Sequence, residues 1–97
     1  MDGGETSTMR EAEEVRTREA AAWIVEYIAR RLKLTPASMA LDAPFTQFGV
    51  DSTFAVVMSG DISAWTGSDV PPNLLYEYPT IMDLARYIAS LDGQELP

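Results

Sequence analysis

Apolar residues recur at helical spacing in three stretches of this chain, residues 18–34, 52–65 and 81–91, and prolines or glycines separate the stretches. No segment alternates apolar and polar residues between turn signals, so strands are not expected. Each helix would carry a single apolar stripe, and the stripes can leave water only by facing one another. The sequence therefore predicts an all-α bundle that forms one domain.

The first and last helices each carry one apolar stripe in the sequence. The first ends before Pro36, which disfavours a helical residue at its preceding position. Its apolar stripe consists of Ala21, Ile24, Val25, Ile28 and Leu32. The last helix is expected to start at a Thr80 cap, with Asp83 in its first turn, and to stop at Gly93. Its stripe consists of Ile81, Leu84, Ala85, Ile88 and Leu91.

The second helix is predicted from Ser52 to about Trp65, with Gly67 as its stop. Its expected buried stripe consists of Ala55, Met58 or Ser59, Ile62 and Trp65. A short helix is expected from Pro72 to Tyr76, because proline suits the first helical position. The predicted architecture is thus a four-helix bundle, with three main helices, a short third helix before the last, and a long first loop.

That long first loop covers residues 35–50. Pro36, Pro44 and Gly49 interrupt it, so it is not expected to be a regular element. Four apolar side chains are expected to hold it against the core: Met39, Leu41, Phe45 and Phe48. A connection of this length inside a small domain is unusual and is often functional.

The two ends of the chain are more polar than its middle. Residues 1–16 are predicted to form a polar leader or linker that is mostly flexible. Thr8 and Glu11 have the spacing of a capping box, which would place helix in part of this leader. The main domain is then expected over residues 17–92, with a tail over residues 93–97. The sequence shows neither a signal peptide nor an apolar run long enough to span a membrane.

The chain contains no cysteine and no histidine. It therefore has no thiol for a disulfide or a metal, and it lacks the commonest general base. This composition suits a reducing compartment, and we expect a cytoplasmic protein. The net charge is −8, and residues 42–97 carry eight acids against one base, Arg86. Such a field disfavours binding to nucleic acid or anionic membranes and attracts basic partner surfaces.

Ser52 follows Asp51 at the predicted start of the second helix. Both residue types favour helix starts, where their oxygens accept backbone N–H bonds, so capping alone is one explanation of the pair. A nucleophilic serine needs a base, and in this chain only a Ser–Lys pair with Lys33 would supply one. Lys33 lies in a basic segment that is expected to be solvated. We therefore expect a hydroxyl that another protein modifies, rather than the nucleophile of a hydrolase.

Other kinds of site have less support from the sequence. The carboxylate pairs Asp42–Asp51 and Asp61–Asp69 lack the spacing of a calcium loop, so no metal site and no catalytic pair is predicted. An aromatic binding platform is also weighed against ordinary packing, which a small domain needs more. The aromatic residues concerned are Trp23, Trp65, Tyr76 and Tyr78.

The segment Gly49-Val50-Asp51-Ser52, followed by a helix, resembles the attachment motif of acyl carrier proteins, in which Gly-x-Asp-Ser-Leu is usual. Residues 42–49, Asp-Ala-Pro-Phe-Thr-Gln-Phe-Gly, resemble the loop that precedes this motif. Residues 70–81 resemble the third-helix region of carrier domains from modular polyketide synthases. The three matches occur in the right order, and the resemblance covers residues 18–92 of the chain.

This resemblance implies that Ser52 receives 4′-phosphopantetheine from coenzyme A, added by a phosphopantetheinyl transferase that uses Mg²⁺. Asp51 would help to orient the transferase's metal and Ser52. The thiol of the arm would hold an acyl group as a thioester, so the protein itself would need no cysteine. The implied protein is a non-catalytic acyl carrier domain of polyketide, mixed polyketide–peptide or fatty acid-like biosynthesis, monomeric when isolated. Ketosynthase, acyltransferase or other synthase domains would be its partners.

Two departures from the family pattern concern the partner surface. Thr53 stands where leucine is usual, and Asp61 is the only acid inside the second helix. Phe54 and Val57 lie off the buried stripe of that helix and, if exposed, would form an apolar spot beside Ser52. Partner binding is therefore expected at Thr53, Phe54, Val57 and Asp61.

Two rival functions stay open. A peptidyl carrier domain of a nonribosomal peptide synthetase is the nearest, but such domains more often show Gly-Gly-His-Ser or Gly-Gly-Asp-Ser, so Val50 favours the acyl class. An unmodified acidic helical adaptor that binds basic partners belongs to a different class. Only the carriers would gain a phosphopantetheine from coenzyme A.

Overall fold

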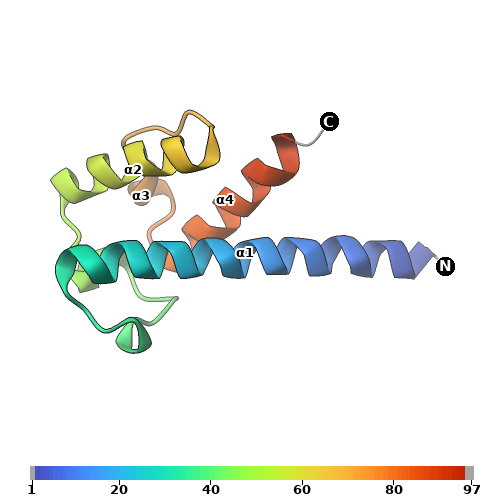
Figure 1. Ribbon diagram of the computed structural model, residues 1–97, viewed down its shortest axis with the longest axis horizontal. Coiled ribbons are helices and arrows are strands. Elements are labelled where there is room, and N and C mark those ends of the chain that lie inside the picture. Colours follow the sequence, from blue (N-terminus) through green and yellow to red (C-terminus); the bar gives the residue numbers. More distant parts are fainter. Residues whose placement is uncertain (1, 96–97) are drawn as a thin grey trace.

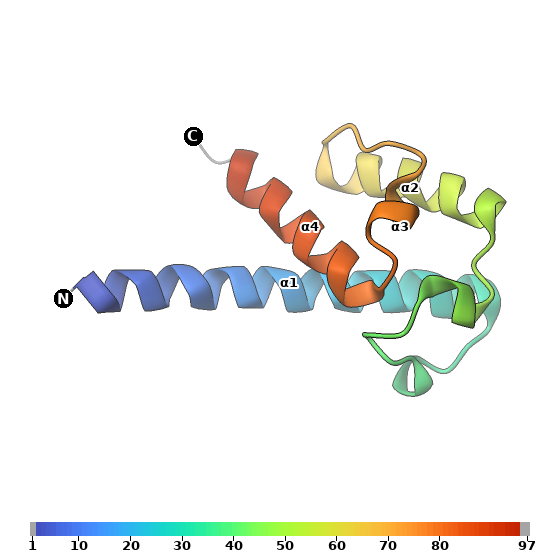
Figure 2. The same ribbon diagram turned by 180° about the vertical axis from the view of Figure 1, so that it is seen from behind.

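The computed structural model describes residues 2–95, and it describes side chains from residue 11 to residue 91. Its elements are the helices α1 (Asp2–Leu32), α2 (Ser52–Thr66), α3 (Leu74–Glu77) and α4 (Ile81–Glu95), with two 3₁₀ turns, η1 (Pro36–Ser38) and η2 (Phe45–Phe48), between α1 and α2. Helices α2 and α4 lie on one side of the long α1 (Figures 1 and 2). The predicted all-α architecture, with a short third helix and a long first loop, is confirmed.

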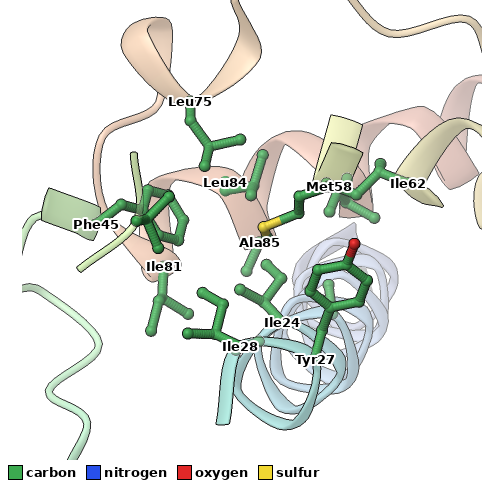
Figure 3. Close-up of a cluster of buried hydrophobic side chains, with 14 of the residues drawn as sticks. Ile24, Tyr27, Ile28, Phe45, Met58, Ile62, Leu75, Ile81, Leu84 and Ala85 are labelled. Carbon is green, nitrogen blue, oxygen red and sulfur yellow. The ribbon is translucent and has the colours of Figure 1, made fainter. Parts of the chain in front are cut away.

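The core lies where α1, α2 and α4 converge, with α3 closing one side (Figure 3). The largest apolar side chains that are fully buried there are Ile24, Ile28, Met58, Ile62, Leu74, Ile81, Leu84 and Ile88. These residues come mostly from the three predicted stripes, and α1 packs most extensively against α4. Helical spacing of apolar residues was therefore sufficient to predict which faces meet.

Helix α1 starts much earlier than predicted. The structure places its start at Asp2, whereas the sequence predicted a mostly flexible leader over residues 1–16. Residues 11–19 are almost all Glu, Arg, Ala and Thr and are largely exposed, so no buried stripe marks them as helical. Glutamate, arginine and alanine are good helix formers, and a helix already nucleated by its packed part extends cheaply. The division of the chain into leader, domain and tail stays a prediction.

The predicted limits of the last two helices also need correction. Helix α4 continues to Glu95, so Gly93 does not stop it. A glycine inside a helix costs about 1 kcal/mol, which weakens a helix without ending it. Helix α3 begins at Leu74 rather than at Pro72, because the chain first makes a turn in which the Leu74 amide donates to the Pro71 carbonyl at 3.1 Å.

Trp65 is not part of the core, contrary to the predicted stripe of α2. Its side chain is 42% exposed, and its ring stacks on Trp23 of α1 at a centroid distance of 4.5 Å. The position lies at the end of α2, where the bundle no longer covers it. The other members of the predicted stripe, Ala55, Met58, Ser59 and Ile62, are buried.

The long first loop is fixed to the start of α4. The Phe45 amide donates to the Pro79 carbonyl at 2.8 Å, and the Met82 amide donates to the Leu41 carbonyl at 3.0 Å. Residues 2–95 contain no strand, and the only strand-like pairing in that range is an isolated bridge between Pro44 and Thr80. These bonds hold the segment before Ser52 against residues 79–82, where α4 begins after α3.

Four apolar side chains were predicted to anchor this loop. Met39 and Phe45 are buried and Phe48 is partly buried, as expected, but Leu41 is exposed. Within the described residues, no helix combines the length and the apolar character that crossing a bilayer requires.

Candidate functional site

Ser52 is the first residue of α2, and its side chain is exposed. The residue before it, Asp51, is the N-cap: one oxygen of its carboxylate, Oδ1, accepts the Phe54 amide at 2.8 Å, and its carbonyl accepts the Ala55 amide at 2.9 Å. The predicted capping of α2 by the Asp51–Ser52 pair thus falls to Asp51 alone. The Ser52 hydroxyl is not used as a cap and projects from the helix start.

The turn that delivers Ser52 depends on Gly49. Its φ is +91°, in the left-handed region that favours glycine, and its amide donates to the Phe45 and Thr46 carbonyls. The next residue, Val50, is buried and donates its amide to the Phe45 carbonyl at 3.4 Å. A buried valine between a glycine turn and a capping aspartate fixes where α2 begins, and hence where Ser52 lies.

A groove of about 250 Å³ opens beside Ser52. Its walls come from η2, from the first turn of α2 and from α3, and they include Phe45, Thr46, Ala55, Leu75 and Tyr76. The walls are mostly apolar. The only carboxylate among the lining residues is that of Asp51, which already accepts the Phe54 amide.

The outer face of α2 next to Ser52 is apolar. Val56 and Val57 are 53% and 52% exposed, and Thr53 is exposed as well. Phe54 was expected on the same surface, but it is only partly exposed and packs edge-on against Tyr27 of α1, with centroids 5.9 Å apart. Val56, which the sequence reasoning did not single out, takes its place on the exposed surface.

Asp61 faces α1 and contacts two side chains of that helix. The Tyr27 hydroxyl donates to its Oδ2, and the Arg31 guanidinium lies 3.6 Å from the same oxygen. Arg31 also lies over the Tyr27 ring, with Cζ 3.9 Å from the centroid. Burial of Tyr27, and next its bond to the Asp61 carboxylate, raise the pKa of Tyr27 to about 12, so its hydroxyl stays protonated as a donor.

Aromatic rings extend this contact along the α1–α2 interface. Trp23 stacks on Tyr27 at 5.1 Å and on Trp65 at 4.5 Å. The expected role of the aromatics in packing therefore holds for these rings, although they lie near the surface. Tyr76 is different: its side chain is 70% exposed, at the rim of the groove beside Ser52.

Lys33, considered as a partner for Ser52, is exposed in the turn that ends α1, where its φ of 57° is left-handed. Within the residues whose side chains are described, no three acidic groups come together as a metal site would require.

Asp51, Ser52 and Thr53 are consecutive residues at the start of α2, and Val57 lies one turn after Thr53. Val56 was not predicted as a site residue, and Tyr76 was considered only as part of an aromatic platform, not as a residue beside Ser52. Val56 lies four residues after Ser52, so helical spacing could have indicated it. No sequence signal shows that Tyr76 lies at the groove, because that depends on how α3 packs beside η2.

Comparison with known proteins shows that the chain is similar to carrier proteins. The family model for the phosphopantetheine attachment site matches residues 22–88. Among curated proteins, the acyl carrier protein TtuC of Teredinibacter turnerae is 34% identical over 68 residues, which are 70% of this chain and 78% of that protein.

Two further matches are to a much longer polyketide synthase and to the structure of a peptidyl carrier protein. A phenolphthiocerol/phthiocerol polyketide synthase of Mycobacterium tuberculosis is 37% identical over 68 residues, and this chain spans only 4% of its length. The structure of a free-standing peptidyl carrier protein from an uncharacterized Acinetobacter baumannii secondary metabolic pathway has a TM-score of 0.72 and 35% identity. That match covers 76% of this chain and 92% of the other.

Proposed function

Because this chain belongs to the phosphopantetheine attachment family of carrier proteins, we propose that Ser52 is the residue that carries its 4′-phosphopantetheine. The observation that supports this most is the exposed Ser52 hydroxyl at the start of α2, directly after a capping Asp51. In the attachment step, Ser52 Oγ forms a bond to the phosphorus that bears pantetheine. The bond from that phosphorus to 3′,5′-ADP breaks, and the transferase takes up the serine proton.

The local structure suits a phosphodiester at this position. Asp51 uses its side chain and carbonyl on the Phe54 and Ala55 amides, so the Ser52 and Thr53 amides have no acceptor within the helix. A helix N-terminus with free amides favours a negatively charged phosphate. The arm supplies the thiol that holds an acyl group as a thioester, in a chain that has no cysteine.

We place the partner surface on the outer face of α2. Thr53, Val56 and Val57 form an exposed, uncharged patch beside the Ser52 hydroxyl. Phe54 and Asp61 lie behind this patch, where their contacts with α1 hold α2 in place. Enzymes that act on the arm, first the phosphopantetheinyl transferase and then synthase domains, would contact this patch mainly through apolar groups.

The wider role that fits best is that of an acyl carrier domain in polyketide or mixed polyketide–peptide biosynthesis. In this role the chain is not itself an enzyme. It acts in the cytoplasm as a monomeric unit and binds neither nucleic acid nor membranes. Similarity to acyl carrier TtuC and to a polyketide synthase supports this role. Asp51 would assist by orienting the metal ion of the transferase.

A peptidyl carrier is the second candidate, and the similarity to a peptidyl carrier structure favours it. The two roles differ in the enzyme that loads the arm. Incubation of the modified protein with an acyltransferase and an acyl-coenzyme A, and separately with an adenylation domain, ATP and its amino acid, distinguishes them by the mass that is added.

The attachment itself is tested by intact mass spectrometry. The purified chain is incubated with coenzyme A, Mg²⁺ and a promiscuous phosphopantetheinyl transferase. The wild type and a Ser38→Ala control, which lacks an exposed serine of η1, should each gain one phosphopantetheine, and Ser52→Ala should gain none. A folded wild type that gains no mass would contradict the proposal and support an unmodified adaptor.

A further inference from the structure

Helix α2 has a weak point near its middle, at the pair Ser59-Gly60. A glycine inside a helix lowers its stability relative to alanine, because the glycine backbone has more freedom to lose. Gly60 is exposed, and a Cβ atom added there would meet no other part of the chain within 4 Å. Alanine would therefore fit at this position, and packing within the domain does not account for the glycine.

The neighbouring Ser59 weakens the same turn. Its side chain is buried, and its hydroxyl donates to the Ala55 carbonyl one turn earlier, at 2.9 Å. This bond lies within α2, so it adds no contact with another element, and bonds of this kind often bend helices. Sharp helix kinks also occur at pairs of glycine and serine. Ser59 and Gly60 together form what we call the joint of α2.

The part of α2 after the joint, residues 61–66, is bonded to other parts of the fold. The Tyr27 hydroxyl of α1 donates to the Asp61 carboxylate. The Val70 amide, in the connection that follows α2, donates to the Ser63 hydroxyl at 3.1 Å. Hydrogen bonds depend on distance and angle, so these contacts fix the orientation of this segment.

The part before the joint, residues 52–58, is held differently. Ala55 and Met58 are buried, and Met58 points into the core (Figure 3). Phe54 packs edge-on against the Tyr27 ring. Among the side chains that the structure describes, none from residues 52–58 forms a hydrogen bond or an ion pair with another element. Apolar contacts are not directional, so this segment can change its angle at less cost than the segment after the joint.

We propose that the segment before the joint pivots about Ser59 and Gly60, while the segment after it stays fixed on α1. Ser52 lies about 10 Å from Ser59 along the helix axis, so a small change of angle at the joint moves its hydroxyl. The role of this motion rests on the proposed function of Ser52: it lets the serine, and later its arm, meet enzymes that approach α2 from different directions. The pivot itself does not depend on that function.

The pivot is tested by amide relaxation-dispersion NMR on the unmodified chain, which detects motions on the microsecond to millisecond timescale. The amides of residues 52–58 should show exchange with one common rate, and those of residues 61–66 should show none. Fraying of the helix end would instead give rates that differ between residues and effects that fade inward from Ser52. Such fading, equal exchange in both segments, or no exchange in either would overturn the pivot.

Two substitutions stiffen the joint in different ways. Gly60→Ala replaces the glycine and should raise the equilibrium constant for folding about two- to fivefold. Ser59→Ala removes the hydroxyl that bonds within the helix, and it leaves the exposed surface of α2 unchanged because Ser59 is buried. Both variants should reduce the exchange at residues 52–58. Exchange that persists in both would overturn the assignment of the joint.

A matched control places a glycine elsewhere in the same helix. Ala64 is exposed and lies after the joint. Ala64→Gly should lower the equilibrium constant for folding by a similar factor, about two- to fivefold, and should leave the exchange at residues 52–58 unchanged. An equal change in that exchange would show that the stability of α2 as a whole controls it, and would overturn the joint.

The role of the pivot is tested with the phosphopantetheinyl transferase. When the enzyme acts on the tilted form, stiffening the joint lowers the population of that form, and kcat/KM falls by the same factor, about two- to fivefold. Ser59→Ala and Gly60→Ala should both show this decrease, and Ala64→Gly should not. Because Ser59 is buried, a slower reaction of Ser59→Ala cannot come from a clash between the enzyme and a new side chain.

The two measurements separate the pivot from its role. A normal kcat/KM in a Ser59→Ala variant whose exchange is suppressed would overturn the role of the pivot in modification. A chain that pivots but accepts no phosphopantetheine would contradict the attachment at Ser52 and leave the pivot standing, because the exchange is measured before modification.

Discussion

Helix α2 turns one face to α1 and the other to solvent, and the two faces use their side chains differently. On the inner face, Asp61 bonds to Tyr27 and pairs with Arg31, and Phe54 packs edge-on against the Tyr27 ring. On the outer face, the Ser52 hydroxyl and Val57 are exposed. The difference indicates that the inner face maintains the fold and the outer face is available to partners.

The comparison predicts that substitutions on the two faces have separable effects, and the largest effect is expected at the core. Ile62 is fully buried, so Ile62→Ala should lower the free energy of unfolding by about 2–5 kcal/mol, through lost burial and the cavity left behind. Urea denaturation measures this. Val57→Ala on the outer face is the matched control and should change stability by less than about 0.5 kcal/mol. Similar losses for both variants would remove the distinction between the faces.

The second effect concerns modification rather than stability. Val57→Asp places a charge in the apolar patch beside Ser52 and should reduce the kcat/KM of the phosphopantetheinyl transferase roughly tenfold, which corresponds to about 1.4 kcal/mol. Its stability should remain close to that of the wild type. Ala64→Asp, an exposed position further along α2, is the control and should be modified at the normal rate. An unaffected Val57→Asp variant would place the partner surface elsewhere.

The third effect is expected at Asp51, the residue that caps the start of α2. Asp51→Ala removes the acceptor of the Phe54 amide and should cost about 1 kcal/mol in thermal or urea unfolding. Asp51→Asn should retain most of this stability, because asparagine caps about as well as aspartate. If the carboxylate also orients the metal of the transferase, Asp51→Asn should still be modified more slowly. Equal rates for Asn and Asp would limit Asp51 to capping.

The smallest effect is a pH dependence of the inner face. The pKa of Tyr27 is raised from 10.0 to about 12 in the folded chain, so the protonated form is stabilised by folding. This contribution is complete below pH 10 and is lost as the pH rises through about 12. The difference in free energy of unfolding between wild type and Tyr27→Phe, expected at about 0.5–1 kcal/mol near neutral pH, should shrink over that interval. A constant difference would show that the Tyr27–Asp61 bond does not govern it.

The sequence predicted what depends on local pattern. The apolar stripes predicted which helix faces meet, and Gly49, Asp51 and Ser52 predicted the start of α2 together with the exposed hydroxyl. The sequence predicted less well the contacts that a side chain makes with residues of other helices. Asp61 belongs to the α1 contact only because Tyr27 and Arg31 lie opposite it, and spacing within α2 cannot show this.

The errors at the ends of helices have a similar origin. Residues 11–19 carry little apolar surface, so their helix follows from propagation of the packed part of α1 rather than from a stripe of their own. Trp65 keeps the spacing of the buried stripe, but it lies at the end of α2, where Trp23 is its neighbour in place of the core. Position along an element, and not only the face, decides whether a side chain is buried.

We expect the hydroxyl of Ser52, and no other hydroxyl of the chain, to accept the prosthetic arm. Proteolysis of the modified wild type, followed by fragmentation of the peptide that spans Gly49 to Val57, tests it most directly. Every modified fragment ion should carry the arm on Ser52, with the neighbouring Thr53 unmodified. An arm found on Thr53, or on a serine elsewhere in the chain, would contradict it.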